Sequence, residues 1–243
     1  MKVDFDVTGK IAVITGAGGI ICGVMAREMA AKGMKVALLD LFEDKAQAIA
    51  DEINAAGGTA IACKANVLDR ESLEEAKKYV LDKFGTIDVL INGAGGNKKG
   101  ATTSAEQDFF HIGVDDLRWV FDLNVMGAVL TTQVFGEVLA EKKDGNVINI
   151  ASMASIIPLT NTIAYSGAKA AVANFTQWMA VHFNQNYSTN IRVNAIAPGF
   201  LLTTQNQFLM QKEDGSPTER GQKVLNKTPM ARYGEPQEMA GPV

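Results

Sequence analysis

Short apolar runs alternate with longer amphipathic stretches along most of the chain. Six of the runs are nearly continuous in hydrophobic residues, which is typical of strands covered on both faces. They are KIAVIT from Lys10, MKVALLD from Met34, TAIACKA from Thr59, IDVLING from Ile87, NVINIAS from Asn146 and NIRVNAIA from Asn190. Helical patterns lie between them, for example over 43–58 and 71–85, and these two end at glycines. The alternation predicts an α/β fold with a doubly wound parallel sheet and right-handed crossovers.

We expect one domain over residues 1–243, because no repeat, low-complexity segment or linker divides the chain. Two segments are irregular: the polar stretch 95–113, and the stretch after Pro198, which predicts a loop with short helices. Both follow the carboxyl ends of predicted strands, where open α/β sheets bind ligands. Long loops in that place are usually functional.

Composition excludes several classes of function. The chain has 243 residues and a formal net charge of −4, and no run of Lys and Arg suggests nucleic-acid binding. The N-terminus lacks the apolar core of a secretory signal, and no apolar run approaches the length of about 18 residues that would predict a membrane span. Two cysteines, Cys22 and Cys63, lie far in sequence from His111 and His182, so we predict no metal site. Reduced thiols and the lack of a leader favour a cytoplasmic protein.

The stretch ITGAGGIICG follows the first predicted strand and leads into a helix. Gly16, Gly18 and Gly19 permit a tight turn, and the helix N-terminus offers N–H groups to a pyrophosphate. Ile20 and Cys22, however, stand where a common form of this motif has its last two glycines. A glycine-rich turn without a cofactor is the alternative interpretation.

Asp40 ends the second predicted strand, where an acid can accept hydrogen bonds from the adenosine ribose. Its charge would repel the additional phosphate of NADP, and Leu41 and Phe42 provide no cation to offset that repulsion. We therefore predict NAD, with NADP less favoured. The alternative is a charge that simply leaves the strand for solvent.

Tyr165 and Lys169 in YSGAK are four residues apart on a predicted helix and share one face. A nearby ammonium favours the phenolate and lowers the pKa of the tyrosine, which would suit it as a general acid or base. Tyr79 and Lys83 have the same spacing on a helix that reads as solvent-exposed. Ser152, at the end of a strand, distinguishes the first pair, because its hydroxyl can bond the same substrate oxygen.

These motifs together resemble the short-chain dehydrogenase/reductase family. The ordered set is TGAGG, Asp40, NGAG from Asn92, NVMG from Asn124, Ser152, YSGAK and PGFLLT from Pro198. The resemblance implies a Rossmann-type three-layer αβα fold and an NAD(P)-dependent oxidoreductase with the tetrad Asn124, Ser152, Tyr165 and Lys169. It also implies that Asn124 holds a water of the proton relay. The expected cofactor contacts are Gly16, Gly18, Gly19, Ile21, Asp40, Asn66, Val67, Asn92, Gly93, Ala94, Gly95, Tyr165, Lys169, Pro198, Gly199 and Thr203.

Several positions depart from the usual family pattern. The usual TGxxxGxG has glycines at the places of Ile20 and Cys22, the usual NNAG is NGAG, and the usual DV is Asn66–Val67. These departures, with INGAGGN before the polar loop, resemble the short-chain-type D-mannonate oxidoreductases (fructuronate reductases). The opening glycines are therefore interpreted as modified rather than decayed.

The subgroup implies reduction of a hexuronate such as D-fructuronate to D-mannonate. Substrate contacts are expected from Asn97, Lys98, Lys99, Ser152 and Tyr165. At least one of the two lysines would contact the substrate carboxylate, although both fit a solvated loop as well. The alternatives are another polyol, gluconate-type or 3-oxoacyl reductase, or a non-catalytic nucleotide-sensing relative.

Family members usually continue beyond GEPQEMAGPV to a last strand, so we expect a sheet that lacks this strand. Helices predicted near 117–140 and 164–183 carry apolar residues on more than one face. A homodimer or homotetramer would cover the apolar faces that do not pack on the sheet, although core packing explains much of the same pattern.

Overall fold

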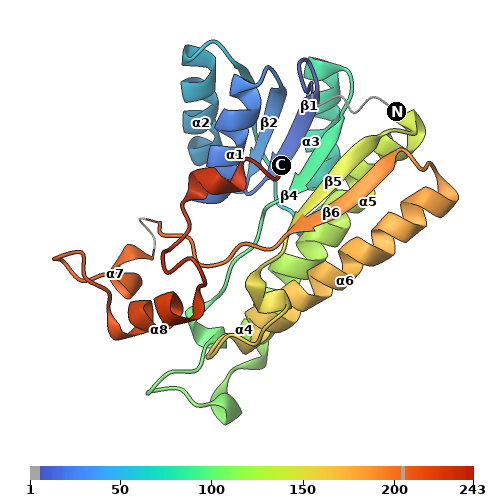
Figure 1. Cartoon of the computed structure of the whole chain (residues 1–243). Coiled ribbons are helices and arrows are strands. Elements are labelled where there is room, and N and C mark those ends of the chain that lie inside the picture. The colour runs from blue at the N-terminus through green and yellow to red at the C-terminus, as the bar shows by residue number, and fades with distance from the viewer. Residues whose placement is uncertain (1–5, 204–205) are drawn as a thin grey trace.

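One six-stranded sheet runs through the molecule, with strand order β3-β2-β1-β4-β5-β6 (Figure 1). The structure, a computed structural model, describes residues 6–203 and 206–243. Every neighbouring pair of strands is parallel. The strands are β1 (Ile11–Thr15), β2 (Lys35–Asp40), β3 (Thr59–Lys64), β4 (Val89–Asn92), β5 (Gly145–Ile150) and β6 (Ile191–Ile196). The strand order reverses between β1 and β4, which is where sheets of this kind bind ligands.

Helices cover both faces of the sheet, as the sequence predicts. Side chains of β1 alternate between two cores: Ala12 and Ile14 pack with α1 and α2, whereas Val13 packs with α3, α5 and α6. The helices are α1 (Ile20–Ala31), α2 (Glu43–Ala55), α3 (Arg70–Phe84), α4 (Val114–Phe121), α5 (Gly127–Lys142), α6 (Ile163–Asn186), α7 (Gln207–Met210) and α8 (Glu219–Lys227). The fold is therefore the predicted doubly wound, three-layer Rossmann-type arrangement.

A single helical segment, Val114–Lys142, joins α4 and α5 through a π-helical turn at Asp122–Met126. By length and composition it could span a membrane, contrary to the expectation that no segment is apolar enough. Half of its most apolar stretch is buried inside the fold, where α5 packs on α3 and the sheet. A core helix of a soluble protein has the same properties, so this is weak evidence for a membrane span.

The chain after β6 leaves the sheet as a loop with the short helices α7 and α8, as predicted, and then returns to the body of the fold (Figure 1). Backbone bonds to Gly234 fasten the start of this segment, and the turn Pro236–Met239 packs on α1. Among the described residues β6 forms one edge of the sheet, with no further strand paired beyond it.

Candidate active site

The turns after β1 and β4 form one continuous surface at the carboxyl edge of the sheet. Thr15 Oγ1 accepts hydrogen bonds from the N–H groups of Gly93 and Ala94, at 3.1 and 3.3 Å. Gly16 has a φ of 64°, and a Cβ there would lie 2.8 Å from the backbone of Ala94. The first glycine is therefore required both by its left-handed conformation and by close packing against the second turn.

The N-terminus of α1 opens onto this surface. Gly19 is the N-cap, no side chain caps the helix, and its first turn carries no acid. The unsatisfied N–H groups and the helix dipole together suit a pyrophosphate. Ile20 is half-buried, and Ile21 packs on the core beneath the helix.

Gly93 packs directly against Cys22, because a Cβ at position 93 would overlap the Sγ of Cys22. The cysteine side chain is buried, and burial raises the pKa of its thiol to about 12. Asn92 lies deeper, with its amide donating to Thr132 Oγ1 at 2.9 Å and to Asn149 Oδ1 at 2.7 Å. Asn92 thus ties β4 to α5 and β5, while the glycines that follow it reach the surface.

The carboxylate of Asp40 faces the glycine turn. Its Oδ2 accepts from the Gly18 N–H and its Oδ1 from the Phe42 N–H, both at 2.9 Å. The side chain is therefore fixed beside the glycine turn, at the end of β2. Lys45 is not among the residues that the sequence motifs predict, because it lies beyond the two positions that follow Asp40. A Cβ on Gly18 would lie 2.6 Å from Lys45 Cβ, so this lysine borders the same turn, although Leu41 and Phe42 themselves carry no cation.

Asn66 and Val67 follow β3 at the same edge. Asn66 Oδ1 accepts from the Leu68 N–H at 3.0 Å, which forms a tight turn. Val67 is buried against Gly127, where a Cβ would lie 2.9 Å from Val67 Cγ2.

Asn124 lies in the π-helical turn, and its side chain bridges this turn to the loop after β4. Its Nδ2 donates to the carbonyls of Gly96 and Val120, at 2.7 and 2.8 Å, and its Oδ1 accepts from the Gly96 N–H. A Cβ on Gly95 would lie 2.6 Å from Asn124 Oδ1 and 3.2 Å from Lys169 Nζ. Gly95 therefore leaves open a space that these two side chains border.

Ser152, Tyr165 and Lys169 come together as predicted. The Ser152 side chain lies beside Tyr165, close enough to influence its pKa, and Lys169 Nζ lies 5.7 Å from the centre of the Tyr165 ring. Lys169 is buried and donates to the Ile150 carbonyl at 2.7 Å. Ser155 Oγ donates to the Lys169 carbonyl at 2.9 Å, which fixes α6 against the end of β5.

The expected lowering of the tyrosine pKa is not found in this arrangement. Burial raises the pKa of Tyr165, and the hydrogen bond from Ser152 opposes that shift. Burial also lowers the pKa of Lys169 to about 8. The physical reason is that both groups lose water, while the ammonium is directed to the Ile150 carbonyl rather than to the phenol.

Tyr79 and Lys83 form the predicted surface pair. Tyr79 on α3 is 37% exposed, with Lys83 Nζ 5.8 Å from its ring centre.

The two lysines of the polar loop have different environments. Lys98 Nζ forms an ion pair with Asp116 at 2.6 Å and lies over the Trp119 ring. Lys99 is exposed, and no carboxylate of the described residues lies within ion-pair distance of it. Asn97 Nδ2 donates to Thr102 Oγ1 at 3.1 Å, which braces the loop.

Pro198, Gly199 and Thr203 follow β6 at the same edge. The Pro198 carbonyl accepts from the Met153 N–H at 3.0 Å, so the loop lies next to Ser152. The Thr203 N–H donates to Asn206 Oδ1 at 2.9 Å, and a Cβ on Gly199 would have no neighbour within 4 Å.

The donor set fits a nicotinamide dinucleotide. A helix N-terminus without acids, an oriented carboxylate and a closely packed glycine turn line one side, and a tyrosine with a serine lines the other. NAD(P), when bound, would supply or accept a hydride. The chain itself would bind it, orient the substrate and hold the proton at Tyr165 Oη.

Comparisons with known proteins agree with this geometry. A family model described as short chain dehydrogenase matches residues 10–214. The chain is 49% identical to an uncharacterised oxidoreductase of Bacillus subtilis named UxuB, over 97% of this chain and 87% of the relative. It is 35% identical to a 3-oxoacyl-[acyl-carrier-protein] reductase of Synechocystis, over 97% and 88% of the two chains.

Among solved structures, a candidate D-mannonate oxidoreductase of Haemophilus influenza with bound NAD superposes with a TM-score of 0.92. It is 45% identical in sequence, over 98% of this chain and 87% of the other. The ordered site and the matches across most of the chain lead to one conclusion. The chain belongs to the short-chain dehydrogenase/reductase family and is an NAD(P)-dependent oxidoreductase.

Proposed function

We propose that the enzyme transfers a hydride between NAD(H) and the secondary alcohol/ketone pair of a sugar acid, with D-fructuronate and D-mannonate as the pair. The observation that carries the chemistry is the Ser152–Tyr165 contact, with Lys169 adjacent, at the carboxyl edge of the sheet. The choice of sugar acid is supported by the similarity to the candidate D-mannonate oxidoreductase and by the polar loop after β4. One domain over residues 1–243 would carry both cofactor and substrate sites.

In this proposal Tyr165 gives its proton to the carbonyl oxygen during reduction and accepts one from the hydroxyl during oxidation. The Ser152 hydroxyl bonds the same oxygen and orients it. Lys169 keeps one N–H on the Ile150 carbonyl, which leaves its other two protons for a ribose hydroxyl. Asn124, anchored to Gly96, would hold the water that returns the proton from solvent.

Lys99 is the better candidate for the substrate carboxylate, since Lys98 is already neutralised by Asp116. We expect Lys99→Ala to raise the KM for D-fructuronate about tenfold, with kcat and the KM for NADH unchanged. Lys98→Ala is the matched control and should shift the same KM by less than about threefold. Equal effects of the two variants would contradict the assignment to Lys99.

The decisive experiment follows NADH absorbance with D-fructuronate, a 5-ketogluconate and a 3-oxoacyl thioester as parallel substrates. Turnover that is fastest with D-fructuronate and is lost in Tyr165→Phe supports the proposal. Turnover with only one of the other ketones would leave the assignment as an oxidoreductase intact and would reject the sugar acid as its substrate.

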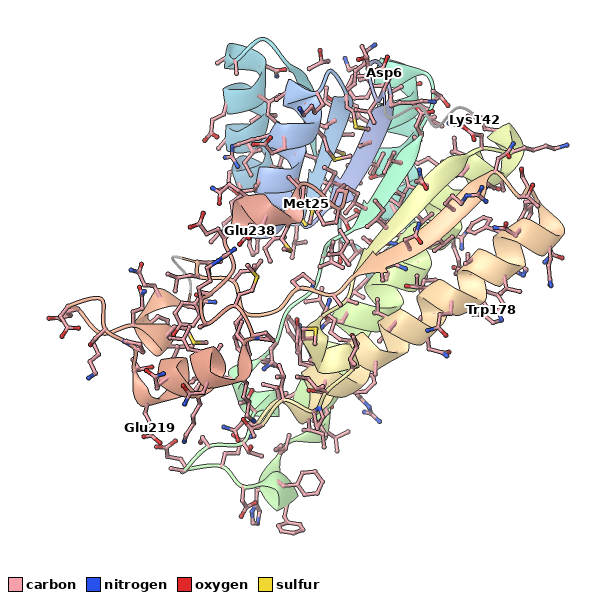
Figure 2. The ribbon with its side chains drawn as sticks, in the orientation of Figure 1. Asp6, Met25, Lys142, Trp178, Glu219 and Glu238 are labelled. Atoms are coloured by element: carbon pink, nitrogen blue, oxygen red, sulfur yellow. The ribbon has the colours of Figure 1, made fainter. Side chains whose placement is uncertain are left out.

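A cytoplasmic homodimer or homotetramer is part of the same proposal. Trp178 and Val181 on the outer side of α6 are 58% and 55% exposed, and Trp178 points away from the sheet (Figure 2). Light scattering after gel filtration would test it, and a monomeric mass at micromolar concentration would contradict it.

A further inference from the structure

A lysine that belongs to no recognised motif borders the ribose side of the glycine turn. Lys45 lies in the first turn of α2, and its stem is close enough to Gly18 that a Cβ there would meet Lys45 Cβ at 2.6 Å. The same Cβ would lie 3.1 Å from Asp40 Oδ2. Asp40 and Lys45 therefore approach the turn from the same side, with opposite charges.

The ammonium of Lys45 has no carboxylate partner among the described residues. It lies 4.8 Å from the ring centre of Phe42, which is 56% exposed. A cation–π contact at an exposed site holds a lysine weakly, and its four-carbon stem can turn toward another anion. Glu43 and Asp44 precede it in the same helical turn and are exposed, yet neither pairs with it.

Asp40, in contrast, is immobilised by the N–H groups of Gly18 and Phe42. In dinucleotide-binding folds an acid in this place accepts from the ribose 2′-hydroxyl, and a cation nearby accommodates a 2′-phosphate. The fixed charge of Asp40 repels that phosphate, while the movable charge of Lys45 would attract it.

We propose that Lys45 is a cofactor-selectivity residue, a latent binding group for the 2′-phosphate of NADP(H) that Asp40 keeps unused. The preference for NAD then results from the balance of Asp40 against Lys45, not from the lack of a cation. The proposal rests on the assignment of Asp40 to the adenosine ribose and is independent of the substrate.

The test measures the Kd of NADPH and of NADH by calorimetry, without substrate. Asp40→Ser should tighten NADPH binding at least about tenfold, because it removes a repulsive charge and leaves Lys45 in place. Adding Lys45→Gln in that background should lose most of the gain, whereas Lys45→Gln alone should change NADH affinity less than about twofold.

Lys64 provides the matched control, because it pairs with Asp40 in register on the neighbouring strand β3. Asp40→Ser/Lys64→Gln should bind NADPH nearly as well as Asp40→Ser. The gain in Asp40→Ser should also shrink as salt is raised, and this salt dependence should be weaker without Lys45. The melting temperature of each variant, with and without dinucleotide, shows that the variants fold.

Equal NADPH affinity in Asp40→Ser and Asp40→Ser/Lys45→Gln would overturn the proposal. The proposal would also be overturned if Asp40→Ser/Lys64→Gln lost as much NADPH affinity as Asp40→Ser/Lys45→Gln, since this would indicate a general effect of positive charge. Failure of the unmodified protein to bind NADH would instead reject the cofactor assignment on which both proposals depend.

Discussion

The sulfur of Cys22 occupies the space that a side chain at position 93 would need, since a Cβ on Gly93 would overlap it. Cysteine in the first turn and glycine in NGAG, which look like two separate departures in the sequence, are therefore one packing arrangement. Thr15 holds the two turns together beside this contact through its hydroxyl. This close packing supports the interpretation that the glycine turn is modified rather than decayed.

Gly93→Ala should lower the free energy of unfolding by about 1–3 kcal/mol and weaken NADH binding, because the new methyl group overpacks the floor. The methyl would also lie 2.7 Å from the Thr15 carbonyl oxygen, so the strand ends must shift. Urea unfolding measures the loss. Gly96→Ala, whose Cβ would have no neighbour within 4 Å, is the matched control and should be near neutral.

Removing the sulfur should rescue part of that loss. Cys22→Ala/Gly93→Ala should be more stable than the sum of the two single variants predicts, because neighbours in contact are not additive. Strict additivity would show that the Thr15 carbonyl alone opposes a side chain at position 93.

Tyr165→Phe should reduce kcat by about two to four orders of magnitude and leave the Kd of NADH within about threefold, because it removes the proton donor but not the cofactor surface. Tyr79→Phe, at the same spacing from a lysine, should keep full activity. Steady-state kinetics with the preferred ketone compares them. Comparable losses in the two variants would contradict the assignment, because spacing from a lysine, and not contact with Ser152, would then decide activity.

The two cysteines should differ in reactivity toward a disulfide reagent. Burial raises the pKa of the Cys22 thiol to about 12, whereas Cys63 is only half-buried, and its burial also raises the pKa of its thiol. Only the thiolate reacts, so near pH 8 we expect Cys63 to react at least about tenfold faster than Cys22. Both should react in guanidinium. Fast labelling of a native Cys63→Ser variant would contradict the burial of Cys22.

Lys169 should make stability depend on pH in the alkaline range. Its folded-state pKa of about 8 lies below the ordinary value of 10.5, so between these values the unfolded chain binds more protons. Stability from this group therefore rises with pH through that window. Relative to Lys169→Met, the cofactor-free protein should gain about 1 kcal/mol between about pH 8 and pH 9. If urea unfolding gave the unmodified protein and Lys169→Met the same dependence of stability on pH, the lowered pKa of Lys169 would be refuted. Lys83→Met, which changes an exposed lysine, is the control.

Much of the fold could be predicted from local pattern. The continuous apolar runs correspond to β1–β6, because a strand covered on both faces shows its burial in its own residues. The spacing of Tyr165 and Lys169 likewise follows from the helical period, and Ser152 from the end of its strand. The direction of the tyrosine pKa did not follow, because it depends on how much water the folded site excludes.

The sequence by itself determined the layered fold, the edge at which the site forms and the residue types that carry the chemistry, since these depend on periodicity and order. Only the tertiary structure decided that Cys22 packs on Gly93, that Asp116 neutralises Lys98 rather than Lys99, and that Lys45 reaches Gly18. The first two contacts join residues far apart in the chain, and long charged side chains settle on whichever partner the fold brings near. Such partnerships are absent from local pattern and arise when the strands and helices pack.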